Sequence, residues 1–457
     1  MSPAELVPFR EALWVWVRVG LQSFGGPAGQ IAVMHRILVD EKRWVSESRF
    51  LHALNYCMLL PGPEAQQLAT YIGWLLHGYR GGLVAGGLFV LPGFVAILAL
   101  SMVYASFQDV GVIAAVFFGL KAAVLAIVLD ALLRIGKRVL VNRAMLAIAV
   151  AAFVGIFVLQ VPFPLIILGA AVIGLLGTQV HPRAFAVVEG RKGTAEAHAS
   201  QLDSVADVLD QHPPAHTIPS RSRALGVLAV GALLWGGPVL TLVVLLGPEH
   251  VLAQEGVFFS KASAVTFGGA YAVLAYIAQQ AVVRFGWLLP GEMLDGLGMA
   301  ETTPGPLVMV VQFVGFMGAY RQLHGVPPLV AGLFGSVVTT WVTFVPCFVW
   351  IFLGAPFIEA LRDKAWLTAA LSAVTSAVVG VILNLALWFA VHTLFREVAE
   401  RSHGVAHLLV PDVSSVNVTA VAITVVACVA VFRIKASMPV TLGGCAALGA
   451  LAHLLVG

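Results

Sequence analysis

Two short motifs, FGG and PGP, each occur twice in this chain, and both predict helix starts that attract anions. FGG stands at Phe24–Gly26 and Phe267–Gly269, and PGP stands at Pro61–Pro63 and Pro304–Pro306. A Gly pair disfavours an unbroken helix, and a Pro suits the first turn of the next helix, where its missing N–H costs nothing. A helix N-terminus carries about half a positive charge and free N–H donors. Each copy therefore predicts two anion-attracting helix N-termini.

Two basic residues, Arg18 and Lys261, stand six positions before the two FGG motifs in apolar surroundings. A cation at membrane depth is costly and usually functional. The alternative is that each side chain extends to an interface or hydrogen-bonds a backbone carbonyl. Because the position recurs in both copies, we include both cations in the predicted anion site. That site comprises Arg18, Phe24, Gly25, Gly26, Pro61, Gly62, Pro63, Lys261, Phe267, Gly268, Gly269, Pro304, Gly305 and Pro306.

One acidic residue accompanies each PGP motif. Glu64 follows the first motif and Glu301 precedes the second. Each is a candidate proton-coupling carboxylate, because acids within a membrane mark proton relays in transporters. Each could equally be a helix cap, and the sequence does not decide which of the two would couple. The neighbouring polar residues are candidates for lining the same site, and they are Gln66, Gln67, Thr302 and Thr303.

Other charges in the apolar segments have structural default interpretations. Lys121 and Asp130 are nine residues apart in one span, which places them near its opposite ends. Glu292 and Asp295 lie one helical turn apart, and solvation at the membrane interface is the default for both. We found no hydrolase, zinc-protease or nucleotide-binding motif. The sequence therefore predicts no enzyme, no metal and no cofactor, and any transport would be driven by an ion gradient.

The elements that position these residues lie in a membrane. Of the 457 residues 60% are hydrophobic and only 11% are charged, whereas a soluble domain has about 25% charged residues. This composition excludes a soluble enzyme, a disordered protein and a nucleic-acid binder. Several apolar stretches reach the ~20 residues that a spanning helix needs. Four others, at residues 12–40, 50–78, 256–282 and 290–320, are interrupted by Gly and Pro and predict broken or re-entrant helices.

An internal repeat organises the chain. A shift of 243 residues superimposes both motif pairs and aligns Trp44 with Trp287, with 11 identities over 40 positions. We therefore predict an all-α polytopic membrane protein with two tandem halves, of the inverted type if segment 224–246 crosses once. The predicted parts are a first repeat at 1–182, a polar cytoplasmic linker at 183–223, a second repeat at 224–400 and C-terminal membrane helices at 401–457. Basic clusters that include Arg134 and Arg138 are assigned to cytoplasmic loops.

The motifs in context resemble the chromate ion transporter family in its long, two-domain form. The resemblance rests on SFGGPAGQIAVM at Ser23–Met34, LLPGPEAQQLATYIG at Leu59–Gly73, TFGGAYAVLAYI at Thr266–Ile277 and TTPGPLVMVVQFVG at Thr302–Gly315. It covers nearly the whole chain. The family's basic residue before FGG corresponds to Arg18 and Lys261. Lys is commoner at the first of these positions, and Arg keeps the charge but changes the geometry.

The resemblance implies a multi-pass inner-membrane protein that exports chromate and so gives chromate resistance. The driving force would be the proton-motive force or the membrane potential. The expected partners are chromate, sulfate as a competitor and the lipid bilayer, without nucleic acid; a homodimer is left open. Transport of sulfate or another oxyanion, including import, is the alternative, and an intramembrane redox enzyme is a further one from another class.

Overall fold

The computed structural model describes residues 7–24, 26–58, 60–107, 110–180, 214–267, 270–357, 365–403 and 406–456. Within these ranges, six helices are long and apolar enough to cross a membrane: Glu64–Phe107, Gly111–Val139, Arg221–Leu246, Pro328–Phe357, Ala369–Leu394 and Met438–Leu455. The predicted helical membrane protein is confirmed. One unpredicted element is an antiparallel hairpin of β1 (Val398–His403) and β2 (Ala406–Pro411).

The first half consists of paired short helices followed by longer ones. Its elements are α2 (Phe9–Gln22), α3 (Gly26–His35), the π-helical turn η1 (Arg36–Glu41), α4 (Glu47–Cys57), α5 (Glu64–Phe107), α6 (Gly111–Val139), α7 (Arg143–Phe157) and α8 (Phe163–Val180). The helix α5 is two helices joined at a kink, where Gly78 has φ of 61°. Side chains of Ser46 and Asn142 cap the starts of α4 and α7, as these residue types commonly do.

The second half repeats this order. Its elements are α12 (Val251–Ala264), α13 (Ala270–Gln279), η3 (Gln280–Arg284), α14 (Glu292–Thr302), η4 (Leu307–Met309), α15 (Val310–Gln322), α16 (Pro328–Gly354), η5 (Ala355–Phe357), α18 (Ala365–Leu394), η6 (Val413–Ser415), α19 (Val418–Cys428), η7 (Val429–Ile434) and α20 (Met438–Val456). A π-helical turn follows the broken helix in both halves. All four interrupted segments are broken into pieces, as predicted.

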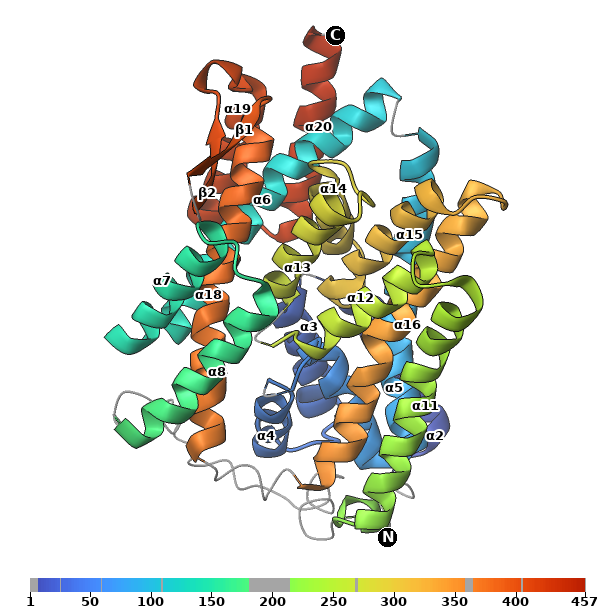
Figure 1. Cartoon of the computed structure of the whole chain (residues 1–457). Helices are drawn as coiled ribbons and strands as arrows, with labels where there is room; N and C mark the ends of the chain where they lie inside the picture. The colour runs from blue at the N-terminus through green and yellow to red at the C-terminus, as the bar shows by residue number, and fades with distance from the viewer. Residues whose placement is uncertain are drawn as a thin grey trace.

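A single long helix joins the halves and inverts the second. The helix α11 (Arg221–Leu246) follows the short turn η2 (Ala215–Thr217). In Figure 1, α11 rises from the end of the molecule where the N-terminus lies, and the C-terminus lies at the opposite end. One extra crossing makes the second half enter from the other face, so the halves form inverted repeats.

The helices form two bundles that are distinguishable in Figure 1. We call α6, α7, α8, α18, α19 and α20 the side bundle, and α2–α5 with α11–α16 the central bundle. In the side bundle the halves exchange helices: α6 packs on α19 and α20, and α18 packs on α7 and α8. All the broken helices lie in the central bundle, so it positions both motif pairs.

The predicted boundaries at residues 182, 223 and 400 remain predictions. Residues 181–213, most of the predicted linker, lie outside the described residues. The order of elements places α19 and α20 where the first half has α7 and α8. On that correspondence the last two helices belong with the second half.

Candidate functional site

The FGG and PGP motifs of opposite halves dock against one another at the centre of the molecule. The N–H of Gly62 donates to the carbonyl of Thr266 at 2.7 Å, and the N–H of Gly305 donates to the carbonyl of Ser23 at 2.9 Å. These two hydrogen bonds are equivalent under the 243-residue shift. We call this meeting point the junction. These two bonds are made by backbone groups alone, so they depend directly on chain conformation.

Both central glycines of the PGP motifs have left-handed backbone geometry. Gly62 has φ of 128° and Gly305 has φ of 102°, a region in which residues with a Cβ are strained. A Cβ at Gly62 would lie 2.8 Å from Cys347 Sγ, and one at Gly305 would lie 3.1 Å from the Cα of Gly93. The sequence therefore needs glycine at both positions for conformation and for space.

Four helical segments begin at the junction, as predicted: α3 at Gly26, α5 at Glu64, α13 at Ala270 and η4, which leads into α15, at Leu307. Pro63 and Pro306 directly precede their helical segments rather than lying inside the first turn. Their carbonyls accept the first backbone bonds, from Gln67 at 3.1 Å and from Met309 at 2.8 Å. Helix starts that converge in this way concentrate partial positive charge and N–H donors in one region.

Glu301 reaches from the end of α14 across to the first half. Its side chain is buried, and its Oε1 accepts a hydrogen bond from the Tyr271 hydroxyl at 2.6 Å. Its Oε2 has no hydrogen-bond partner among the described residues. A Cβ at Gly26 would lie 3.9 Å from that oxygen. The free oxygen of Glu301 thus faces the start of α3, where an anion would compete with it.

Two glutamines, Gln67 and Gln30, hydrogen-bond to carbonyls of the PGP motifs, whereas Gln66 bonds within α5. Gln67 donates to the carbonyl of Pro61 at 2.8 Å, and Gln66 donates to Thr70 one turn along α5. Gln30 donates to the carbonyl of Gly305 at 2.6 Å and was missed. Its partner is 275 residues away in sequence, so local spacing carries no signal for it.

The two threonines after Glu301 close the end of α14. Thr302 donates to the carbonyls of Gly298 and Met299, and Thr303 donates to that of Ala300 at 3.4 Å. Both hydroxyl protons are thus directed to their own helix. Their predicted role in lining the anion site remains a prediction.

The FGG motifs differ in exposure between the halves. Phe24 is 40% exposed, whereas Phe267 is half-buried. Gly25, Gly268 and Gly269 lie outside the described residues. The first-half motif is therefore the more accessible one at the positions that can be compared.

The structure places Arg18 and Lys261 on exposed helix faces rather than at the junction. Arg18 pairs with Glu41 of η1 at 2.8 Å, and these side chains are 45% and 37% exposed. Lys261 is exposed on α12, and no ion pair links it to an acid within the described residues. Their role as anion ligands remains a prediction.

Two arginines that the sequence predicts in a cytoplasmic loop belong to α6. This helix continues to Val139 and ends in basic residues. Arg134 pairs with Asp130 one turn earlier, and Arg138 is exposed.

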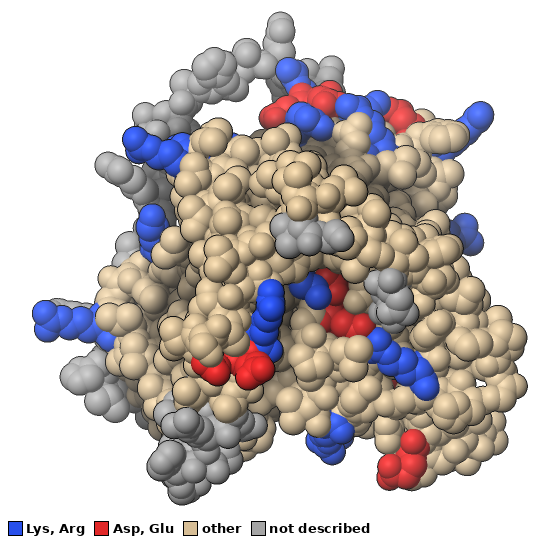
Figure 2. Space-filling model, turned by 90° about the horizontal axis from the view of Figure 1, so that it is seen from above, with Lys and Arg blue, Asp and Glu red and all other residues tan. Residues whose placement is uncertain are grey.

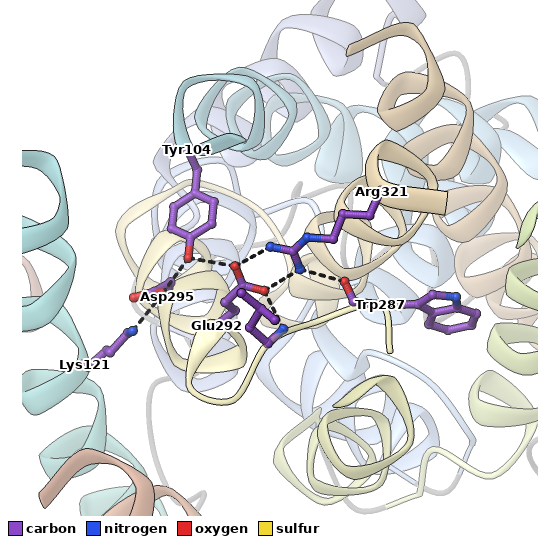
Figure 3. Close-up of polar contacts among 7 residues, drawn as sticks. Tyr104, Lys121, Trp287, Glu292, Asp295 and Arg321 are labelled. Carbon is purple, nitrogen blue, oxygen red and sulfur yellow. Dashed lines mark hydrogen bonds and ion pairs between the residues drawn. The ribbon is translucent and has the colours of Figure 1, made fainter. Parts of the chain in front are cut away.

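A second group of charged residues lies between α14 and its neighbours (Figure 3). Lys121 of α6 pairs with Asp295 of α14 at 3.1 Å. The Tyr104 hydroxyl lies 2.9 Å from Asp295 and 3.3 Å from Glu292. Arg321 of α15 binds both carboxylate oxygens of Glu292, at 2.6 and 2.7 Å. We call these five residues the α14 network.

The α14 network corrects two structural expectations. Glu292 and Asp295 were expected at the solvated interface, but they are only 4% and 1% exposed. Buried carboxylates need partners because an unpaired buried charge is costly, and the three donors supply them. Lys121 was expected to serve a structural role within its own span, whereas it pairs with a helix of the other half. Lys121 and Tyr104 lie more than 170 residues from their acidic partners, so spacing could not reveal these contacts.

Comparison with known proteins gives a consistent answer. A family model described as chromate transporter matches residues 10–175 and 254–450. The chain is 32% identical to a chromate transport protein of Pseudomonas aeruginosa over 372 residues, which is 80% of this chain and 77% of that protein. It is 28% identical to a chromate transport protein of Cupriavidus metallidurans, over 82% of this chain and 80% of that protein. No solved structure matches.

Proposed function

The chain belongs to the chromate transporter family, and from this premise we propose that it is a secondary transporter that exports chromate across the inner membrane. Chromate resistance would follow from the lower cytoplasmic concentration. Two curated relatives are described as chromate transport proteins and align over about four fifths of this chain. The membrane potential favours expulsion of a dianion by ~2.3 kcal/mol per charge per 100 mV.

The observation that carries the proposal is the junction, where the reciprocal bonds of Gly62 and Gly305 bring the starts of broken helices from both halves together. Chromate is a tetrahedral dianion with oxygens in every direction. Backbone N–H groups that converge from several helices suit such a ligand, because each can donate to a different oxygen. Transporters with inverted repeats commonly bind substrate at this kind of repeat interface.

Glu301 is the residue that we propose links anion binding to protons. Its free oxygen faces the start of α3, and an ionised carboxylate there would repel an incoming dianion. Protonation removes that repulsion, so one proton and chromate would bind together, and the pair keeps one net negative charge that the membrane potential expels. Glu64 opens α5, whereas Glu301 has an oxygen that is unbonded within the described residues and faces the start of α3 in the opposite half, and we therefore assign the coupling to Glu301.

The cytoplasmic face is proposed to be the one on which α11 begins. The basic residues Lys42 and Arg43 lie between η1 and α4, and Arg221 and Arg223 open α11. Clusters of this kind favour the cytoplasm. Export then runs from the face on which α11 begins to the opposite face, on which α11 ends.

Chromate flux into inside-out vesicles tests the proposal. Uptake driven by an imposed potential, positive inside the vesicle, is the expected result, with and without a separate pH gradient. Excess sulfate should inhibit, because it has the same shape and charge. Vesicles that contain Gly305→Ala protein serve as the matched control. Potential-independent flux, or flux equal to that control, would contradict export by this mechanism.

A further inference from the structure

The two halves contact the side bundle unequally. In the second half, α13 packs on α18, and α14 packs on α6 and α20. The equivalent helices α3 and α4 make no comparable contacts with α6, α18 or α8 among the described residues. The helix α14 is buried along nearly its whole length, whereas Leu51 of α4 is 46% exposed. We call the α14 side closed because α14 packs against the side bundle, and the α4 side open because α4 makes no comparable contact with that bundle among the described residues.

One ion pair crosses between the bundles on the closed side. Lys121 belongs to the side bundle, and Asp295 belongs to the central bundle. Of the ion pairs that the described residues form, this is the one that joins the two bundles. Tyr104 and Arg321 with Glu292 hold the remaining contacts of the α14 network within the central bundle.

The cation of this pair is accessible while its acid is not. The Lys121 side chain is 27% exposed and that of Asp295 is 2% exposed. Figure 2 looks down on the molecule from above and shows basic and acidic side chains together in a central hollow, with further charged side chains around the rim. An approaching anion would meet the cation of the pair first. If α14 moved away from α6, Lys121 would lose its counter-ion and would need another.

We propose that Lys121 alternates between two counter-ions: Asp295 when the α14 side is closed, and the transported oxyanion when that side opens. This inference rests on the proposed function for the identity of the anion. The pseudo-symmetry of the repeats supplies the alternate state, in which α4 closes against α18 while α14 separates from α6. Lys121 would then guide the dianion between the junction and the α14 face.

A reversible disulfide tests whether α14 and α6 must separate. The ideal Cβ at Gly298 lies 3.4 Å from the Cβ of Leu120, which is close to disulfide geometry. Oxidation of Leu120→Cys/Gly298→Cys protein should abolish flux, and dithiothreitol should restore it. The matched control is Gly231→Cys/Val349→Cys, whose Cβ atoms also lie 3.4 Å apart but within the central bundle. Its oxidation should leave flux unchanged. Undiminished chromate flux in the oxidised Leu120→Cys/Gly298→Cys protein would show that α14 and α6 need not separate, and would overturn the proposal.

Charge variants test the exchange of counter-ions. Lys121→Met should lower flux by about tenfold or more, and Lys121→Arg should retain it within about threefold, since the cation itself is needed. Asp295→Asn should keep flux within about threefold while making a Gly298→Cys reporter react faster with a membrane-impermeant thiol reagent. Equal losses in Lys121→Met and Asp295→Asn, with unchanged reporter reactivity, would reduce the pair to a structural contact and overturn the proposal.

The reporter reactions separate this inference from the proposed function. They measure opening of the α14 side without any transported anion. If wild-type protein carries no chromate but the Asp295→Asn change still speeds labelling of the Gly298→Cys reporter, opening of the α14 side is supported and chromate is rejected as the substrate. If chromate flux persists both in the oxidised disulfide variant and in Lys121→Met, chromate is supported as the substrate and the counter-ion exchange of Lys121 is rejected.

Discussion

At the scale of single residues, the junction requires glycine at two positions, because glycine has no Cβ atom. Gly62 and Gly305 combine a positive φ with neighbours that leave no room for a Cβ. Each then donates its N–H to the opposite half. The same residue type thus sets the conformation, allows the close approach and supplies the donor. Substitution at either position should affect both stability and transport.

Gly305→Ala should destabilise the protein by about 1–3 kcal/mol and greatly reduce chromate flux, because strain and crowding both act there. Thermal unfolding in detergent, together with flux in vesicles, checks this prediction. Gly443→Ala is the control, since nothing lies within 4 Å of its Cβ position in α20, and Ala is favoured over Gly within a helix. Equal behaviour of the two variants would contradict the role of the junction.

Glu301→Gln should keep chromate flux but flatten its dependence on pH. In the wild type, flux should fall as pH rises, because ionised Glu301 repels the dianion at the start of α3. Glutamine resembles the neutral acid and remains neutral at every pH. The ratio of variant flux to wild-type flux should therefore rise with pH, and this ratio cancels any titration of the anion itself. A ratio that stays constant with pH would show that a residue other than Glu301 couples proton binding to chromate transport.

At the scale of elements, α6 brings basic residues toward the central bundle. Lys121 pairs with Asp295 of α14, and Lys137 and Arg138 lie in the last turn of α6. A helix from the side bundle therefore supplies a cation to the α14 network, which the central bundle otherwise builds. Its movement relative to that bundle would change the charge around the anion.

Arg134→Gln and Arg138→Gln should each raise the KM for chromate by about tenfold with a smaller effect on kcat, because they remove long-range attraction for the dianion. Lys137→Gln is the control on the same helix, one residue before Arg138 and exposed. Initial rates in vesicles at several chromate concentrations give the comparison. Identical KM values in all three variants would show that α6 does not attract the anion.

At the scale of the whole molecule, the inverted halves place the two ends of the chain on opposite faces (Figure 1). The β1–β2 hairpin lies toward the end where the C-terminus lies. In the second half, α13 and α14 pack against the side bundle, whereas the equivalent first-half helices α3 and α4 make no comparable contacts among the described residues. This asymmetry between homologous halves is what an alternating-access transporter shows in a state that is open to one side.

The predicted orientation can be checked by fusing reporters to the chain ends. A fluorescent protein fused to the N-terminus should be active in the cytoplasm. Alkaline phosphatase fused to the C-terminus should be active outside the inner membrane, since the basic loops of the first half favour the cytoplasm. Cytoplasmic localisation of both ends would contradict the single crossing by α11.

The sequence by itself determined the membrane class, the two halves, the four broken segments and the glycines and prolines that break them. These features follow from local composition and a repeat at fixed spacing, which backbone physics interprets directly. Only the tertiary structure decided which atoms meet: Gly62 with Thr266, Glu301 with the start of α3, and Lys121 with Asp295. Such contacts join residues that are far apart in the chain and are selected by helix packing. For the same reason, only the structure shows that Arg18 of α2 pairs with Glu41 of η1.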